Sequence, residues 1–242
     1  MDNKEFSTIP ITIPKQIICV LGMHRSGTSC LTGSLQAGGL FLGKHHTWNK
    51  HNVKGNRENQ DVVDLHDDLL MTNGGSWDNP PKKTIWQPRH YQRAQEILAE
   101  YADVPIWGFK DPRALLLIEG WRQLVPSMQF VGIYRHPLAV VQSLHNRGQF
   151  CRERALQLWA SYNSRLLEVY KKNPFPVLSF DVDEAKFNDL LIALHAQLGL
   201  APLSESERFY SAELRNCQDF TNEKLPWRVT RLYNRLHKIG LR

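Results

Sequence analysis

The sequence lacks the features that define several large classes of protein. No hydrophobic run approaches the roughly 20 residues of a membrane-spanning helix, and the first residues lack the apolar core of a secretory signal. The four cysteines, at positions 19, 30, 151 and 217, include no Cys-x-x-Cys pair, which disfavours a zinc site and favours unpaired thiols in a reducing cytoplasm. Internal repeats and low-complexity tracts are also missing. These absences favour one cytoplasmic domain of ordinary size, 1–242, that does not span a membrane.

Charge is the compositional feature that bears most directly on function. The 242 residues include 30 Lys and Arg against 24 Asp and Glu, a formal net charge of +6, with ten histidines besides. This balance suits anionic ligands such as nucleotides, acidic glycans, nucleic acid or an anionic membrane. The basic residues are spread along the chain without a nucleic-acid-binding motif, so nucleic acid is not expected as a partner.

Hydrophobic periodicity predicts strands that alternate with helices. Strands are predicted over Gln16–Leu21, 105–109, Gln129–Tyr134 and 175–180. Helices are predicted from the first strand's turn to Ala37 and over 56–71, 89–101, 112–124, 137–147, 152–171, Glu184–Leu198 and Trp227–Ile239. This order predicts a three-layer, P-loop-like α/β fold with a mainly parallel central sheet and a helical insertion between the first two strands. Residues 1–15 are expected to form an extended lead-in, and 201–242 a polar tail with a solvated basic helix; contact of that helix with an acidic acceptor or a nucleotide is the alternative.

The most informative segment is the turn at 22–29, Gly-Met-His-Arg-Ser-Gly-Thr-Ser, between a buried strand and a helix. Its two glycines have the spacing of a phosphate-binding loop. Thr28 stands where nucleotide triphosphatases carry a lysine, and a cation appears earlier, at Arg25. Backbone N–H groups from Ser26 to Ser29 are expected to point at an anion, aided by the helix dipole. A glycine turn with Thr28 as the helix cap and no ligand is the alternative.

Two further strand ends carry cations. Lys110 directly follows the second predicted strand, in the sequence Lys-Asp-Pro-Arg, and Arg135 directly follows the third. Because the carboxyl ends of parallel strands meet at one edge of a sheet, we expect Arg25, Lys110 and Arg135 to share an anion site. Ser143 and then Arg147 follow Arg135 on one face of a helix and could grip a second phosphate. Without other support, a surface arginine and an ordinary helix serine would be the preferred interpretation of that pair.

In this order and spacing, the segments at 22–29, 110–113 and 135–143 resemble the motifs of sulfotransferases that use 3′-phosphoadenosine 5′-phosphosulfate (PAPS). The likeness is greatest to the branch of tyrosylprotein and many bacterial sulfotransferases, which carry Arg-Ser-Gly-Thr-Thr/Ser in the loop. It covers about residues 16–200. The resemblance implies transfer of a sulfuryl group from PAPS to a hydroxyl without a metal ion. A carbohydrate acceptor is expected by analogy, because bacterial relatives of this branch often act on glycans.

The resemblance also implies roles for individual residues. The loop would hold the 5′-phosphosulfate through Arg25, Ser26, Gly27, Thr28 and Ser29. Arg135, Ser143 and Arg147 would hold the 3′-phosphate, and Lys110 would lie near the transferring sulfuryl group. Arg25 and Lys110 would then stabilise the charge that develops in the transition state.

A general base must take the proton of the acceptor hydroxyl. The family often supplies a glutamate some way after the first helix, which implies Glu58; a helix-N-terminal acid with no catalytic role is the alternative. His66 is the second candidate base, since imidazole titrates near neutral pH, although a lone helical histidine is more often a packing residue. His45 and His46 are third.

Aromatic residues are candidates for acceptor contact. Trp48, Trp77 and Trp86 fall in loops of the predicted insertion and could form a sugar-stacking platform; closing over the core is the alternative. Phe180 and Asp181 replace the Tyr and Glu of a further segment of the family, which puts any role for them in doubt.

Two other functions are compatible with the loop. One is a divergent P-loop kinase or nucleotide triphosphatase, which needs Mg²⁺ and an acidic ligand for it, with Asp111 as the candidate. The other is a module that binds a nucleotide or polyanion without turnover.

Overall fold

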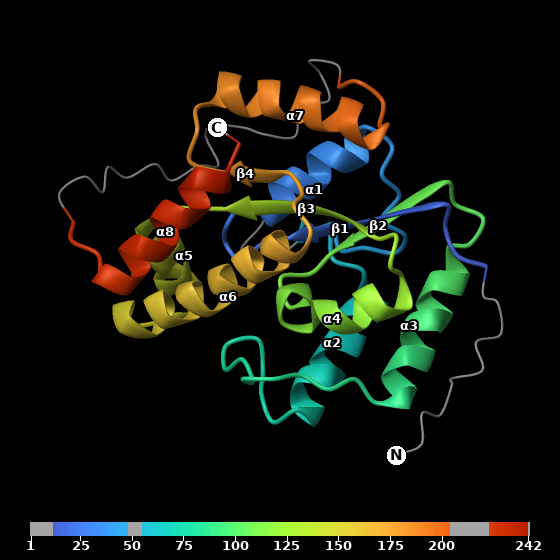
Figure 1. Ribbon diagram of the computed structural model, residues 1–242, viewed down its shortest axis with the longest axis horizontal. Helices are drawn as coiled ribbons and strands as arrows, with labels where there is room; N and C mark the ends of the chain where they lie inside the picture. The colour runs from blue at the N-terminus through green and yellow to red at the C-terminus, as the bar shows by residue number, and fades with distance from the viewer. Residues whose placement is uncertain (1–11, 48–54, 204–222, 242) are drawn as a thin grey trace.

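A computed structural model of the chain describes residues 12–47, 55–203 and 223–241 (Figure 1). Trp48, Cys217, most of the predicted lead-in and part of the predicted tail lie outside these ranges. One sheet has the strand order β2-β1-β3-β4 with all pairings parallel: β1 (Gln16–Leu21), β2 (Ile106–Lys110), β3 (Gln129–Tyr134) and β4 (Val177–Ser179). The helices are α1 (Thr28–Ala37), α2 (Gln60–Thr72), α3 (Pro88–Glu100), α4 (Ala114–Leu124), α5 (Pro137–Gly148), α6 (Arg152–Lys172), α7 (Glu184–Leu198) and α8 (Trp227–Ile239).

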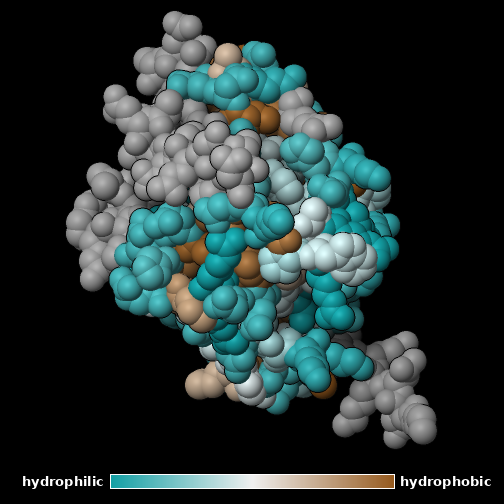
Figure 2. Space-filling view, turned by 90° about the vertical axis from the view of Figure 1, so that its left-hand side faces the viewer, coloured by the Kyte–Doolittle hydropathy of each residue, from teal (hydrophilic) through white to brown (hydrophobic). Residues whose placement is uncertain are grey.

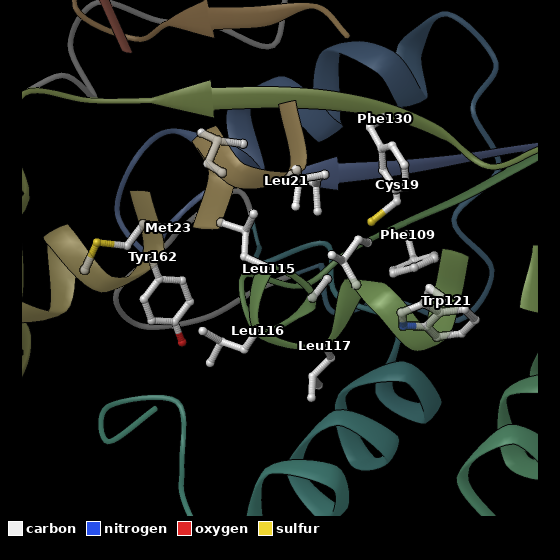
Figure 3. Close-up of a cluster of buried hydrophobic side chains, with 14 of the residues drawn as sticks. Cys19, Leu21, Met23, Phe109, Leu115, Leu116, Leu117, Trp121, Phe130 and Tyr162 are labelled. Carbon is white, nitrogen blue, oxygen red and sulfur yellow. The ribbon is translucent and has the colours of Figure 1, made fainter. Parts of the chain in front are cut away.

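The layers follow from the alternation of side chains along the strands. On β1, Ile18 and Val20 point to one face of the sheet, which α1 and α7 cover. Cys19 and Leu21 point to the other face, toward Leu115 of α4 (Figure 3). Helices α2 and α3 form the insertion between β1 and β2 and pack outside α4 (Figure 1). The predicted three-layer α/β class is therefore confirmed.

Several predicted bounds shift by one or two residues, and two of the differences have a clear physical cause. The helix predicted over 56–71 begins at Gln60, because the Asn59 side chain accepts hydrogen bonds from the backbone N–H groups of Asp61 and Val62 and caps it there. The fourth strand covers 177–179 rather than 175–180, since Pro176 has no N–H group for the ladder. The first change matters for the site, because Glu58 lies in an extended approach to α2 and not in its first turn.

The order of the strands sets the location of a ligand site. From β1 the chain reaches β2 on one side of it, and then crosses by α4 to β3 on the other side. The loop after β1 and the ends of β2 and β3 therefore meet at the carboxyl edge, a common ligand position in parallel sheets. Figure 2 views the molecule from this side, where the exposed side chains are mostly hydrophilic. No helix in the described ranges combines the length and hydropathy of a membrane span.

We expect the change Asn59→Ala to lower the free energy of unfolding by about 2 kcal/mol, as measured by urea denaturation. It removes the cap of α2 and also the hydrogen bond from Asn59 Nδ2 to the hydroxyl of Tyr101, 2.9 Å long and buried. Asn59→Asp keeps the capping oxygen and should recover about half of the loss. If both variants unfold at the wild-type midpoint, Asn59 does not hold the start of α2.

Candidate active site

The β1–α1 loop has the backbone of an anion-binding turn. Gly27 has φ +88°, and a Cβ atom there would lie 2.4 Å from the ring of Phe180, so only glycine fits. The N–H of Ser26 donates to the carbonyl of Met23 at 3.2 Å and is used inside the turn, contrary to the prediction that it points at the anion. The N–H groups of the first three residues of α1, Thr28 to Cys30, have no partner within the helix. The Ser26 hydroxyl is buried and has no hydrogen-bond partner in the described part of the chain, so it is available to a polar ligand or a water molecule.

Two arginines, Arg135 and Arg147, lie close to Arg25 of this loop. Arg25 Nε donates to Ser143 Oγ of α5 at 2.7 Å, and Arg135 Nη1 donates to the carbonyl oxygen of Arg25 at 3.3 Å. Burial lowers the pKa of Arg25, and the charges of Arg147 and Arg135 lower it further. The structure thus brings together the four side chains that the sequence assigned to two phosphate groups. Such crowding of like charge is relieved when an anion binds among them.

Phe180 and Asp181, for which the sequence left any role in doubt, position both parts of this cluster. The Phe180 ring packs on Gly27, and the Arg135 guanidinium lies 5.4 Å from the centre of the same ring. Asp181 Oδ2 accepts a 2.6 Å hydrogen bond from the backbone N–H of His136, where α5 begins. The segment just after β4 therefore contacts both the β1–α1 loop and the start of α5, and fixes their positions relative to each other.

Lys110 and Glu58 form an ion pair at the end of β2. Lys110 Nζ donates to Glu58 Oε1 at 2.7 Å, with only 2% of the lysine side chain and 14% of the glutamate exposed. Ser29 Oγ donates to the carbonyl of Asn56 at 3.1 Å, so this hydroxyl links the loop to the segment that carries Glu58. The Ser29 hydroxyl is therefore engaged within the protein, while its role in holding a phosphosulfate stays a prediction. The pair joins the two residues predicted to flank the transferring group.

His66, the second candidate base, is fully buried behind this pair. Its Nδ1 lies 2.8 Å from Asp111 Oδ2, and its Nε2 accepts from Trp121 Nε1 at 2.8 Å, so both ring nitrogens are engaged. Asp111 Oδ1 in turn accepts from the backbone and side chain of Arg113. Burial alone raises the pKa of Asp111, but Arg113 and the His66 hydrogen bond hold it below its usual range. His66 is therefore a positioning residue, since it has no nitrogen left for an acceptor proton.

The same network bears on metal binding. Both oxygens of Asp111 bond to protein groups, so the acid proposed for Mg²⁺ in the nucleotide triphosphatase alternative is already committed. In the described ranges, no three His, Cys, Asp or Glu side chains gather in a metal-binding group.

Sequence reasoning missed Arg113, whose guanidinium donates a hydrogen bond to Asp111 and forms an ion pair with Asp67, with Nε 2.7 Å from Oδ1. Burial lowers its pKa, but the charges of Asp111, Asp67 and Glu58 raise it well above the ordinary value, so it stays cationic. Its position after Lys110 and Asp111 in one motif was the signal for it.

His24 is the second missed residue, although it stands inside the loop motif. Its ring contacts Trp77, with centres 4.7 Å apart, and Tyr162 of α6 at 5.7 Å. Its Nε2 atom is buried and has no hydrogen-bond partner among the described residues. Burial lowers the pKa of His24 well below its usual value, and the charge of Arg113 lowers it further. The His24 ring is therefore neutral at pH 7, and the charges of Arg113, Lys110 and Arg147 all act on it in that direction.

Of the described tryptophans proposed for acceptor contact, only Trp77 lies beside the loop. Trp86 packs on Trp121, with ring centres 5.6 Å apart, and its Nε1 donates to the carbonyl of Leu117, so it closes the core. The third-ranked histidines bond elsewhere: His45 to Gln36 and His46 to Gln60.

Comparison with known proteins was made on sequence and on structure. No protein-family model matches the sequence, and no curated protein matches it. The structure is similar to the sulfotransferase domain of the olefin synthase from Synechococcus PCC 7002, with a TM-score of 0.60, 16% identity, and 93% of this chain and 96% of that chain covered. It is also similar to sulfotransferase STF1 from Mycobacterium tuberculosis H37Rv, with a TM-score of 0.51, 15% identity, and 94% and 78% covered. The fold is therefore sulfotransferase-like.

The buried His24 predicts a pH-dependent stability. The unfolded chain binds a proton at this residue near pH 6.5, whereas the folded chain does not, so the free energy of unfolding falls as the pH drops below that value. When the pH is lowered from about 7.5 to 5.5, the free energy of unfolding of the wild type should fall by about 1 kcal/mol more than that of the variant His24→Gln. Urea denaturation at both pH values measures this difference. Loss of packing alone would lower the variant's free energy of unfolding by the same amount at both pH values. If wild type and variant lose the same free energy of unfolding between the two pH values, His24 is not the residue responsible.

Proposed function

We propose that this chain transfers a sulfuryl group from PAPS to an acceptor hydroxyl. The observation that carries the proposal is the convergence of Arg25, Arg135, Arg147 and Ser143 on the β1–α1 loop. A loop with a helix N-terminus and a separate arginine cluster suits a ligand with two anionic groups, such as the phosphosulfate and the 3′-phosphate of PAPS. The sulfotransferase-like fold supports the same conclusion by analogy.

The donor would bind across the two halves of the cluster. In this proposal, the phosphosulfate lies against Arg25, the backbone of Gly27 and the N–H groups of Thr28 and Ser29, with the buried Ser26 hydroxyl as a further donor. Arg135, Ser143 and Arg147 hold the 3′-phosphate. The bond from Arg25 to Ser143 links the two positions, so binding at one end orders the other.

The chemistry assigns complementary roles to Glu58 and Lys110. The acceptor oxygen attacks sulfur, a new S–O bond forms, and the bond from sulfur to the bridging oxygen breaks, so that its electron pair leaves on the phosphate. The acceptor proton passes to Glu58, whose carboxylate keeps one oxygen for Lys110 and has a second for the substrate. Lys110 and Arg25 stabilise the charge on the sulfuryl and leaving oxygens.

The acceptor is proposed to be a carbohydrate. Trp77 packs on His24 of the loop and is partly buried, so one aromatic surface lies close to the proposed reaction centre. Aromatic rings provide large apolar faces for ligands of this kind.

The site gives no equivalent support for ATP as the ligand. Thr28 stands where ATP-binding loops carry a lysine, and Asp111, the candidate Mg²⁺ ligand, already bonds His66 and Arg113.

Donor binding is tested by isothermal titration with 3′-phosphoadenosine 5′-phosphate, with and without Mg²⁺. We expect binding that does not need the metal and that weakens about 10- to 100-fold in Arg135→Ala, because charge-assisted hydrogen bonds to a phosphate are lost. Lys186→Ala, on α7, is the matched control that removes one exposed cation elsewhere. Tighter binding of ATP with Mg²⁺ would overturn the proposal in favour of a kinase.

Catalysis by Glu58 is tested with PAPS and a panel of p-nitrophenyl glycosides as acceptors. Glu58→Gln should lower the turnover number about 100-fold or more while the affinity for 3′-phosphoadenosine 5′-phosphate stays within about twofold. Glu58→Asp keeps the carboxylate and should recover part of the rate. Donor binding without any sulfated product from the wild type would identify a binding module instead.

A further inference from the structure

Helix α8 carries a stripe of basic residues on its outer face. Arg228, Arg231, Arg235 and Lys238 are all exposed, and their spacing of three, four and three residues places them on one side of the helix. We call these four residues the basic stripe. The helix contains no acidic residue, and none of the four forms an ion pair in the described part of the chain. Glu223, just before the helix, is engaged by Arg152. The stripe is therefore a surface of one sign of charge.

An exposed aromatic residue adjoins the stripe. Trp227 is 69% exposed at the start of α8, and the guanidinium of Arg231 lies 5.4 Å from the centre of its ring. Large exposed aromatic side chains beside cations are typical of binding surfaces, since the ring supplies contact area and the cation supplies charge.

The opposite face of α8 is occupied by the protein. Val229 and Leu236 are buried, and Tyr233 packs against Trp159 of α6. An amphipathic helix that lies on a membrane must bury its apolar face in the lipid. Because the apolar face of α8 already packs on the domain, only the basic stripe and Trp227 are presented to a partner.

The stripe lies next to the proposed donor site. Tyr233 contacts His136, with ring centres 5.0 Å apart, and Tyr134 Oη lies 3.1 Å from His237 Nδ1. Helix α8 therefore contacts the two residues that precede and follow Arg135 in the sequence. The outer face of α8 is thus about one helix diameter, roughly 10 Å, from the residues that surround Arg135.

We propose that the basic stripe binds an anionic polysaccharide, a sugar polymer that carries carboxylate or sulfate groups. Four cations in a row complement a polymer with repeated negative charge, and Trp227 offers a face on which a sugar ring can pack. The choice of a polysaccharide rests on the proposed function, because each sulfuryl transfer adds a negative charge and a repeatedly modified acceptor becomes a polyanion. The binding itself does not require the transfer reaction.

Single-stranded nucleic acid fits the stripe less well. Proteins that bind it without sequence preference stack successive bases on several aromatic side chains along a basic groove. Trp227 is the one exposed aromatic on the outer face of α8, as far as the described residues show. The stripe therefore offers charge along its length but a ring at one end only.

The test measures binding of a heparin oligosaccharide to the full chain at several salt concentrations. The triple variant Arg228→Gln, Arg231→Gln, Arg235→Gln should bind about tenfold more weakly or worse, and the slope of log K against log salt should fall by about three. The control Lys82→Gln, Lys83→Gln, Lys186→Gln has the same change in net charge on exposed residues elsewhere and should bind within about twofold of wild type. Trp227→Ala should weaken binding without changing the salt slope.

Other probes separate this proposal from its rivals and from the proposed function. Neutral dextran should not bind, and single-stranded DNA or phosphatidylserine vesicles should bind more weakly than heparin at equal charge; tighter binding of either would overturn the choice of partner. Equal losses in the two triple variants would overturn the stripe as a site. Both variants should retain affinity for 3′-phosphoadenosine 5′-phosphate, so a failure of the donor site is measured separately.

Discussion

The crowding of positive charge at the carboxyl edge of the sheet is the constraint on which the rest of the structure depends. Parallel strands bring Arg25, Lys110 and Arg135 to the same edge of the sheet, and burial weakens the screening of the repulsion among the arginines. The protein offsets part of this cost with two carboxylates, Glu58 beside Lys110 and Asp111 beside Arg113. In the proposed function, an anionic ligand among the arginines would lower the remaining repulsion. Stability and ligand binding would then be coupled through the same side chains.

Residues far apart in the chain hold this charged edge in a defined geometry. Phe180, just after β4, packs on Gly27. Asp181 accepts a hydrogen bond from the backbone N–H of His136 at the start of α5, and Ser29 bonds the segment before α2. Behind them the buried chain from Trp121 through His66 to Asp111 orients Arg113. Groups that are already oriented need little rearrangement when a ligand arrives, and this favours both tight binding and transition-state stabilisation.

The fold could be predicted from the sequence because its signals are local. Apolar runs marked the four strands, and β1 and β3 have the bounds that periodicity predicts. The start of α2 was predicted four residues too early, since the cap at Asn59 depends on contacts with Tyr101 and Leu42 as well as on the helix itself. Three tryptophans were predicted as candidates for acceptor contact. Of the two that the structure describes, Trp77 lies beside the loop, whereas Trp86 packs on Trp121 in the core.

The sequence by itself determined the order of the elements, the glycine spacing of the loop and the residue types at each strand end, because these features depend on neighbours along the chain. Only the tertiary structure decided which of those residues meet. Arg25 bonds Ser143 across 118 positions, and His66 bonds Asp111 across 45. The second contact makes His66 a buried support rather than a base, and it is the kind of fact that periodicity cannot supply. Which side chains become neighbours, and which are desolvated, is set by how the layers pack.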